Sequence, residues 1–201
     1  MVESLSTPIV FEKPLAEILV EGELSAFEEE ALYNLLRRSF KVDPPSFIQF
    51  PYGMEDYTTR LNVTFHYPYI QEFFSKHLQE NWREFKDLVK NLRYRRGNAG
   101  AAFVLTFAED DQGFSLVFHS GDLDHNQMSS ALDQVGYLTG LLRADVLKPG
   151  TLPANVRKVE CYFDKVSDRW SRFQGTDEDG TRTYLFNEDS SAWDDTKTVS
   201  R

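Results

Sequence analysis

The sequence predicts an α+β fold, with a mainly antiparallel sheet of β-hairpins packed on one face by about three helices. Stretches in which apolar and polar residues alternate indicate strands with one buried face. Other stretches carry apolar residues at helical spacing, and the longest predicts one long helix near 69–96. Helices separated by hairpins favour an antiparallel sheet that is covered on one face.

Length and composition predict that most of the chain folds. A chain of 201 residues buries roughly 70% of its unfolded surface, which is enough for a sizeable core. The aromatic content of 14% is too high for a disordered chain, because large rings drive collapse. We expect a frayed N-terminus at 1–8, a single domain at 9–186, and a polar tail at 187–201 that is disordered except near Trp193.

The first predicted elements are a strand at 17–21 and a helix that starts with a capping box. Ser25 and Glu28 stand at the spacing at which each side chain bonds the other's backbone N–H. Prolines at 44–45 end this helix soon after Phe40. Its apolar stripe consists of Phe27, Leu32, Leu35 and Leu36.

A short strand at 47–50 and an alternating strand at 59–67 precede the long helix. Pro68 stands where a first helical turn tolerates proline, and Gly97 is suited to ending the helix. The stripe that predicts this helix consists of Ile70, Phe73, Phe74, Leu78, Trp82, Phe85, Leu88, Val89 and Leu92.

Two hairpins and one more helix complete the predicted fold. The first hairpin joins strands at 101–108 and 114–119 through a loop that contains glycine. Asp122 or Asp124 then caps a helix whose apolar stripe runs from Met128 to Leu142. A strand at 156–164 follows. The second hairpin joins 170–173 to 181–186.

The charge balance narrows the classes of partner. Lys and Arg number 22 against 32 Asp and Glu, so the net charge is −10. Such a chain repels nucleic acid and anionic membrane surfaces and suits a basic protein partner. One cysteine, no signal-peptide pattern and no apolar run near the ~20 residues of a membrane span predict a cytoplasmic protein.

The segment 119–125 (HSGDLDH) is the best candidate for metal chemistry. His119, Asp122, Asp124 and His125 offer nitrogen and oxygen ligands between a strand and a helix, which suits a divalent metal and hydrolysis by a metal-bound water. The segment is similar to the HxHxDH loop of the metallo-β-lactamase fold, with Ser120 and Asp122 where that motif has histidines. The competing interpretation is a helix cap, a glycine turn and two solvent-facing histidines.

Two further patterns carry alternative interpretations. Arg93, Arg95 and Arg96 could hold a phosphate or an RNA backbone, or could instead complement the dipole at the end of a helix. Gly136 and Gly140, four residues apart, let another backbone approach closely. Packing within the chain is the favoured explanation of these glycines, and a homodimer is the second.

The C-terminal region combines acids with aromatic residues. Tyr184, Trp193, Asp194 and Asp195 are the candidate partner-binding residues, because aromatic anchors among acids suit docking on a basic protein. The competing interpretation is a solvated hairpin whose rings pack inward.

No P-loop, GxGxxG, CxxC pair, HExxH or GxSxG motif occurs, and no cofactor is predicted. In element order and charge the chain is similar to small acidic secretion chaperones. We therefore expect a non-catalytic protein-interaction domain of the assembly-factor, chaperone or adaptor type. A metal-dependent hydrolase or metal-binding protein is the alternative, and phosphate or RNA binding is the third hypothesis.

Overall fold

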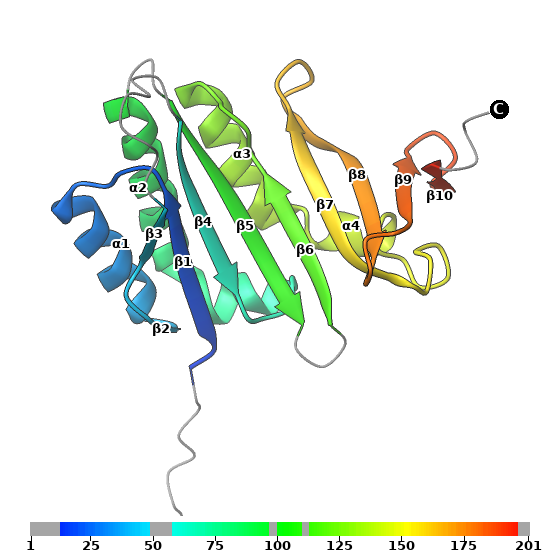
Figure 1. Cartoon of the computed structure of the whole chain (residues 1–201), viewed down its shortest axis with the longest axis horizontal. Coiled ribbons are helices and arrows are strands. Elements are labelled where there is room, and N and C mark those ends of the chain that lie inside the picture. Colours follow the sequence, from blue (N-terminus) through cyan, green and yellow to red (C-terminus); the bar gives the residue numbers. More distant parts are fainter. Residues whose placement is uncertain (1–12, 49–57, 97–99, 110–112, 197–201) are drawn as a thin grey trace, which may run out of the picture.

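In a computed structural model, a mixed sheet of ten strands carries its helices on one face (Figure 1). The structure describes residues 13–48, 58–96, 100–109 and 113–196. The strands are β1 (Leu15–Glu21), β2 (Lys41–Val42), β3 (Ser46–Ile48), β4 (Thr59–Phe65), β5 (Ala101–Glu109), β6 (Phe114–His119), β7 (Val156–Asp164), β8 (Arg169–Asp177), β9 (Thr183–Asn187) and β10 (Ala192–Asp195). The helices are α1 (Ala26–Arg37), the π-helical segment η1 (Phe73–Leu78), α2 (Gln79–Arg96), α3 (His125–Tyr137) and α4 (Thr139–Ala144).

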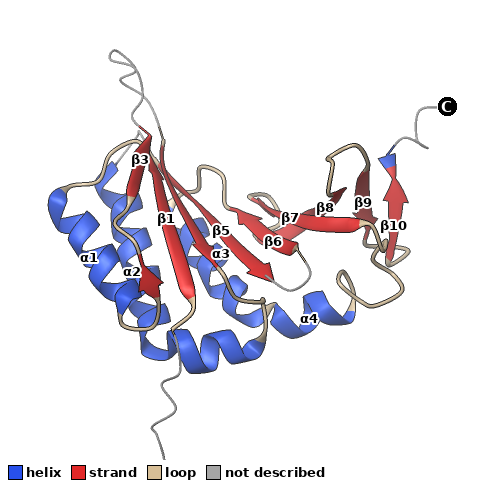
Figure 2. Ribbon diagram, turned by 60° about the horizontal axis from the view of Figure 1, so that its bottom comes forward, coloured by secondary structure: helices blue, strands red, loops and turns tan. Residues whose placement is uncertain are grey.

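The predicted α+β class is confirmed, with a sheet that is mostly but not wholly antiparallel. The strand order is β10–β9–β8–β7–β6–β5–β4–β1–β2, and β3 also pairs with β1. The pairs β1–β2, β1–β3, β4–β5 and β6–β7 are parallel. Between the two strands of each pair the chain passes through helix, and such a crossover returns the chain in the same direction. All the described helices therefore lie on one side of the sheet (Figure 2).

The predicted long helix is confirmed, and it contains a π-helical segment near its start. Helical structure begins at Gln71 and runs through η1 and α2 to Arg96. The backbone N–H of Gln79 donates to the carbonyl of Phe74, five residues earlier, which is the π spacing. Phe73, Phe74 and Leu78 are all buried in this segment. None of the helices in the described ranges is long and apolar enough to cross a membrane.

An aromatic layer fills the space between the sheet and the helices. Phe65 of β4 and Phe107 of β5 both contact Phe73 of η1, with ring centroids 4.9 and 5.1 Å apart. Tyr69 lies 4.9 Å from Phe107 and 5.1 Å from Phe118 of β6. Most of these rings meet edge to face or tilted, the arrangements that aromatic quadrupoles favour.

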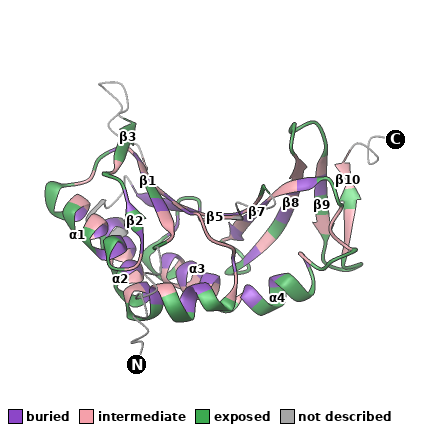
Figure 3. Cartoon of the chain, turned by 90° about the horizontal axis from the view of Figure 1, so that it is seen from below, coloured by how far each residue is buried: buried purple, intermediate pink, exposed green. Residues whose placement is uncertain are grey.

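The other face of the sheet is concave and carries no helix from the described part of the chain. Figure 3 shows the sheet with its two ends rising away from the side that holds the helices. On this open face, residues that are paired in register on adjacent strands form rows that run across the sheet. One row from β1 to β7 consists of Leu19, Asn62, Val104, His119 and Tyr162.

The C-terminal segment corrects one expectation. We predicted a tail at 187–201 that is disordered except near Trp193, but β9 runs to Asn187 and Ala192–Asp195 form β10, which pairs with β9 in a hairpin. The reason is the ring of Trp193, which packs on Phe186 at 5.5 Å and donates its indole N–H to the carbonyl of Val146 at 3.0 Å. Residues 197–201 lie outside the described part of the chain.

We predict that Phe107→Ala destabilises the whole fold, because Phe107 is 1% exposed and contacts the rings of both neighbouring strands and η1. The expected loss in the free energy of unfolding is about 3–5 kcal/mol. Urea unfolding followed by tryptophan fluorescence measures it. The control is Val166→Ala, at a position 95% exposed, with an expected change under about 0.5 kcal/mol. Equal small losses in the two variants would contradict the account of the core.

Candidate functional site

A groove between α1 and α2 combines apolar and acidic side chains and has a volume of about 260 Å³. Its apolar residues come from both helices, and so do its carboxylates. The apolar residues are Phe27, Ala31, Leu88 and Leu92. The acidic residues are Glu28, Glu84 and Asp87.

Phe27 corrects the predicted apolar stripe of α1. We expected it to join Leu32, Leu35 and Leu36 in the core, but it is 70% exposed while those three are buried. The helical angle gives the reason. At about 100° per residue, Phe27 points roughly 140° away from Leu32. Its ring therefore lies on the surface, where it lines the groove.

Ionic and polar contacts hold the two helices together at the end of the groove near Arg38. The guanidinium Nη1 of Arg38 lies 2.7 Å from Glu84 Oε2, and Asn81 Nδ2 donates to Ser39 Oγ at 2.9 Å. At the other end, the predicted capping box of α1 is confirmed. The backbone N–H of Ser25 donates to the Glu28 carboxylate at 2.8 Å. The groove is therefore formed before any partner binds.

The Glu84 and Asp87 carboxylates on the groove face solvent, whereas Glu28 is buried. The side chains of Glu84 and Asp87 are 48% and 58% exposed, although they also pair with Arg38 and Lys90 within the chain. Glu29 and Glu30 follow Glu28 in the first turns of α1, beside Phe27. An exposed ring beside several carboxylates suits a partner that has both an apolar face and positive charges.

The structure separates the four residues of the predicted metal site. His119 ends β6 on the open face of the sheet, whereas Asp124 is the N-cap of α3 and accepts from the Gln127 N–H at 2.8 Å. Asp122 lies against the backbone of Gly100, where an added Cβ would meet its Oδ1 at 2.5 Å. His125 is the first residue of α3 and is exposed. Among the described residues, no three His, Cys, Asp or Glu side chains gather to hold a metal.

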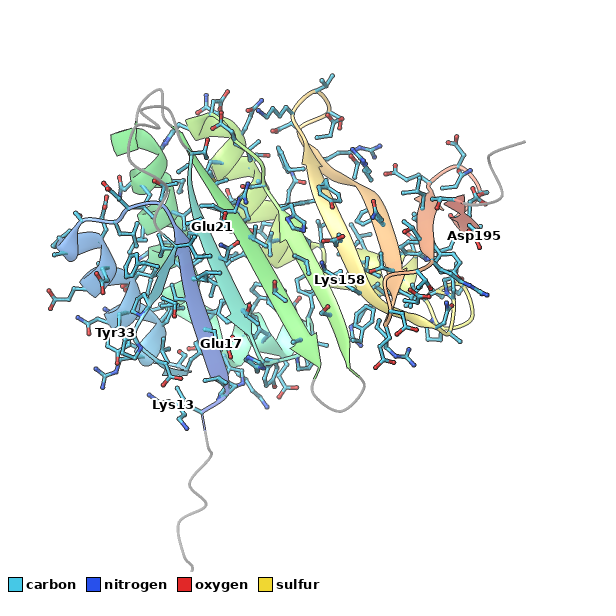
Figure 4. The ribbon with its side chains drawn as sticks, in the orientation of Figure 1. Lys13, Glu17, Glu21, Tyr33, Lys158 and Asp195 are labelled. Carbon is cyan, nitrogen blue, oxygen red and sulfur yellow. The ribbon has the colours of Figure 1, made fainter. Side chains whose placement is uncertain are left out.

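His119 instead belongs to a polar cluster on the open face. Its Nε2 lies 3.1 Å from Glu160 Oε1, which also pairs with Lys158 Nζ at 2.7 Å, and its ring stacks on Tyr162 at 4.9 Å. Burial lowers the pKa of His119, and the hydrogen bond to Glu160 offsets only part of that shift. Burial acts to raise the pKa of Glu160, but the bonds from Lys158 and His119 outweigh it and lower the pKa. Figure 4 looks onto this face and labels Lys158 on β7, whereas the labelled Glu17 and Glu21 lie on β1, with β6, β5 and β4 in between.

The predicted anion-binding arginines fall partly outside what the structure describes. Arg93, Arg95 and Arg96 lie in the last turns of α2, but their side chains are outside the described part. The prediction of phosphate or RNA binding therefore stays a prediction. Gly136 packs within the chain, since an added Cβ would lie 3.2 Å from Trp82 Nε1. Homodimerisation also stays untested.

The aromatic residues of the predicted partner-binding set pack inward. Tyr184 is 8% exposed and shares hydrogen bonds of 3.1 and 3.2 Å with the side-chain amide of Asn155. The Trp193 ring packs against Gly175, where an added Cβ would lie 3.1 Å from Cζ3. Of the two acids, Asp194 is exposed and Asp195 is half-buried.

No family model, curated protein or solved structure matches the chain. The sequence did not predict the groove, because the groove forms between α1 and α2, two helices that are far apart in the sequence. The one signal in the sequence was the helical angle between Phe27 and Leu32, which places Phe27 on the surface of α1.

We predict that stability falls as the pH drops below 6.5, the ordinary pKa of histidine. Burial lowers the pKa of both His119 and His77 in the folded state, so the unfolded chain takes up protons more readily. The stability that depends on the neutral histidines is complete above the pKa of histidine in the unfolded chain. It is lost as the pH falls through the lower pKa of the folded state.

Thermal unfolding at pH values from about 7.5 to about 5.5 measures this effect. Carboxylates titrate at lower pH, so they contribute little within this window. His119→Gln should show a smaller decline than the unmodified chain, with the remainder due to His77. An identical decline in both proteins would show that His119 does not contribute.

Proposed function

We propose that this chain is a non-catalytic protein-interaction domain of the cytoplasm, of the assembly-factor, chaperone or adaptor type. The observation that carries the proposal is Phe27, a ring 70% exposed in a groove that also holds carboxylates. Exposed aromatic residues in preformed hollows are typical anchors of protein interfaces. The binding surface is the α1–α2 groove, in place of the C-terminal hairpin.

The partner we propose is a basic amphipathic helix. Such a helix places apolar residues three and four apart into a groove between two helices, which is a common mode of peptide recognition. Phe27, Ala31 and Leu88 offer apolar contacts along the groove. Lys or Arg side chains on the partner would pair with Glu84 and Asp87 at the edge.

The two other hypotheses have less support. His119 lies in the open-face cluster with Glu160 and Lys158, while Asp124 is engaged as the cap of α3. The arginine prediction rests on three side chains that are outside the described part of the chain. The groove, by contrast, has described residues of both α1 and α2 in its lining.

We predict that Phe27→Ala weakens binding of a synthetic lysine–leucine peptide that forms an amphipathic helix. Loss of a central aromatic anchor costs about 2 kcal/mol or more, which corresponds to roughly thirtyfold in the dissociation constant. Fluorescence anisotropy of the labelled peptide measures the affinity. Because Phe27 is mostly exposed, the variant should unfold within about 0.5 kcal/mol of the parent.

Tyr137→Ala is the matched control, since Tyr137 is an aromatic residue 81% exposed on α3, outside the groove. It should leave the affinity unchanged. A glutamate–leucine peptide of the same pattern should bind more weakly than the lysine–leucine peptide. Equal effects of Phe27→Ala and Tyr137→Ala would exclude the groove as the binding surface.

Asp87→Asn should slow association of the lysine–leucine peptide and reduce its dependence on salt, with little change in dissociation. Charges at the edge of an interface act mainly on the association rate. Asp87 pairs only with Lys90 among the described residues, so the change should not loosen the helices. Stopped-flow measurements at low and high salt give both rates. An unchanged association rate at low salt would contradict the electrostatic part of the proposal.

A further inference from the structure

A pocket of about 630 Å³ lies between the starts of β6 and β7, α4 and the loop that joins α4 to β7. This volume is within the usual range of small-molecule sites, about 300–1,000 Å³. Its apolar wall is made by Phe114, Leu147, Leu152 and Val156.

The loop over this pocket is held from two sides. Within the loop, the backbone N–H groups of Thr151 and Leu152 both donate to the carbonyl of Lys148, at 3.0 and 3.2 Å. From the C-terminal hairpin, Trp193 donates to the carbonyl of Val146 and Tyr184 bonds Asn155. The two aromatic residues predicted to bind a partner therefore fix the wall of the pocket.

The charge in the pocket is opposite to that of the chain. Among the described residues that line it, the charged ones are Arg143 and Arg157, although the chain has a net charge of −10. Arg157 Nη1 donates to the carbonyls of Ala154 and Val156 at 3.0 and 3.2 Å. Arg143 Nε donates to the carbonyl of Tyr69 at 3.3 Å. Backbone contacts thus hold both guanidinium groups in place.

We propose that this pocket binds a carboxylate that carries an apolar chain, of the medium-chain fatty-acid class. The planar guanidinium group matches the geometry of a carboxylate and donates two parallel N–H bonds to it. The hydrogen bonds of Arg157 to described residues use Nη1, so Nη2 and Nε remain as donors for the anion. The hydrocarbon chain lies along Phe114, Leu147 and Leu152 and is removed from water.

Isothermal titration of the full chain with decanoate tests this proposal, with decanol and decylammonium as chemical controls. Decanoate should bind at one per chain, and both controls should bind at least tenfold more weakly. Arg157→Ala should weaken decanoate binding at least tenfold. Arg83→Ala, which removes an exposed arginine of α2 away from the pocket, should have no effect.

A second variant keeps the test decisive if Arg157→Ala loosens the loop. Leu152→Glu places a negative charge on the pocket wall, leaves both arginines in place and should abolish decanoate binding. Binding of decanol or decylammonium as strong as that of decanoate would overturn the proposal. So would unchanged decanoate binding in Leu152→Glu, or in a folded Arg157→Ala variant.

Discussion

Aromatic rings packed between the sheet and its helices are the contact on which the rest of this structure depends. Phe73 joins the long helix to β4 and β5 through Phe65 and Phe107, with centroids about 5 Å apart. The contacts continue through Phe118 to Trp170 of β8, whose ring centroids are 5.0 Å apart. One continuous layer therefore spans strands that are distant in the sequence. Removing a ring from its centre leaves a cavity that neighbouring rings cannot fill without losing their own contacts.

This one-sided core decides which surfaces remain for binding. Because the helices of the described ranges all cover one face, the outer sides of these helices and the grooves between them form part of the molecular surface. The α1–α2 groove lies on this surface, where Phe27 cannot reach the core. On the open face, charged residues such as Glu21 and Arg60 pair with one another across strands at 2.9 Å. That pair engages two charges of the open face within the chain, whereas the groove leaves the apolar ring of Phe27 exposed.

Local sequence patterns predicted most of the helices and strands. The features that these patterns did not predict depend on packing between segments that are far apart in the sequence. The capping box of Ser25 and Glu28 and the alternation of β4 depend on neighbours in the sequence, so they could be recognised directly. The parallel pairs depend on how the crossover helices return the chain, which alternation alone does not specify. The inward packing of Trp193 depends on the missing side chain of Gly175, eighteen positions earlier on a strand two places away. No local pattern carries that information.

The backbone amide NMR spectrum of the isotope-labelled chain, recorded during titration with the lysine–leucine peptide, would locate the binding surface residue by residue. We expect the largest shifts in α1 near Phe27 and in the turns of α2 that hold Glu84 and Leu88. Shifts concentrated in β9 and β10 or on the open face of the sheet, with α1 unaffected, would contradict the claim that the groove is the binding surface.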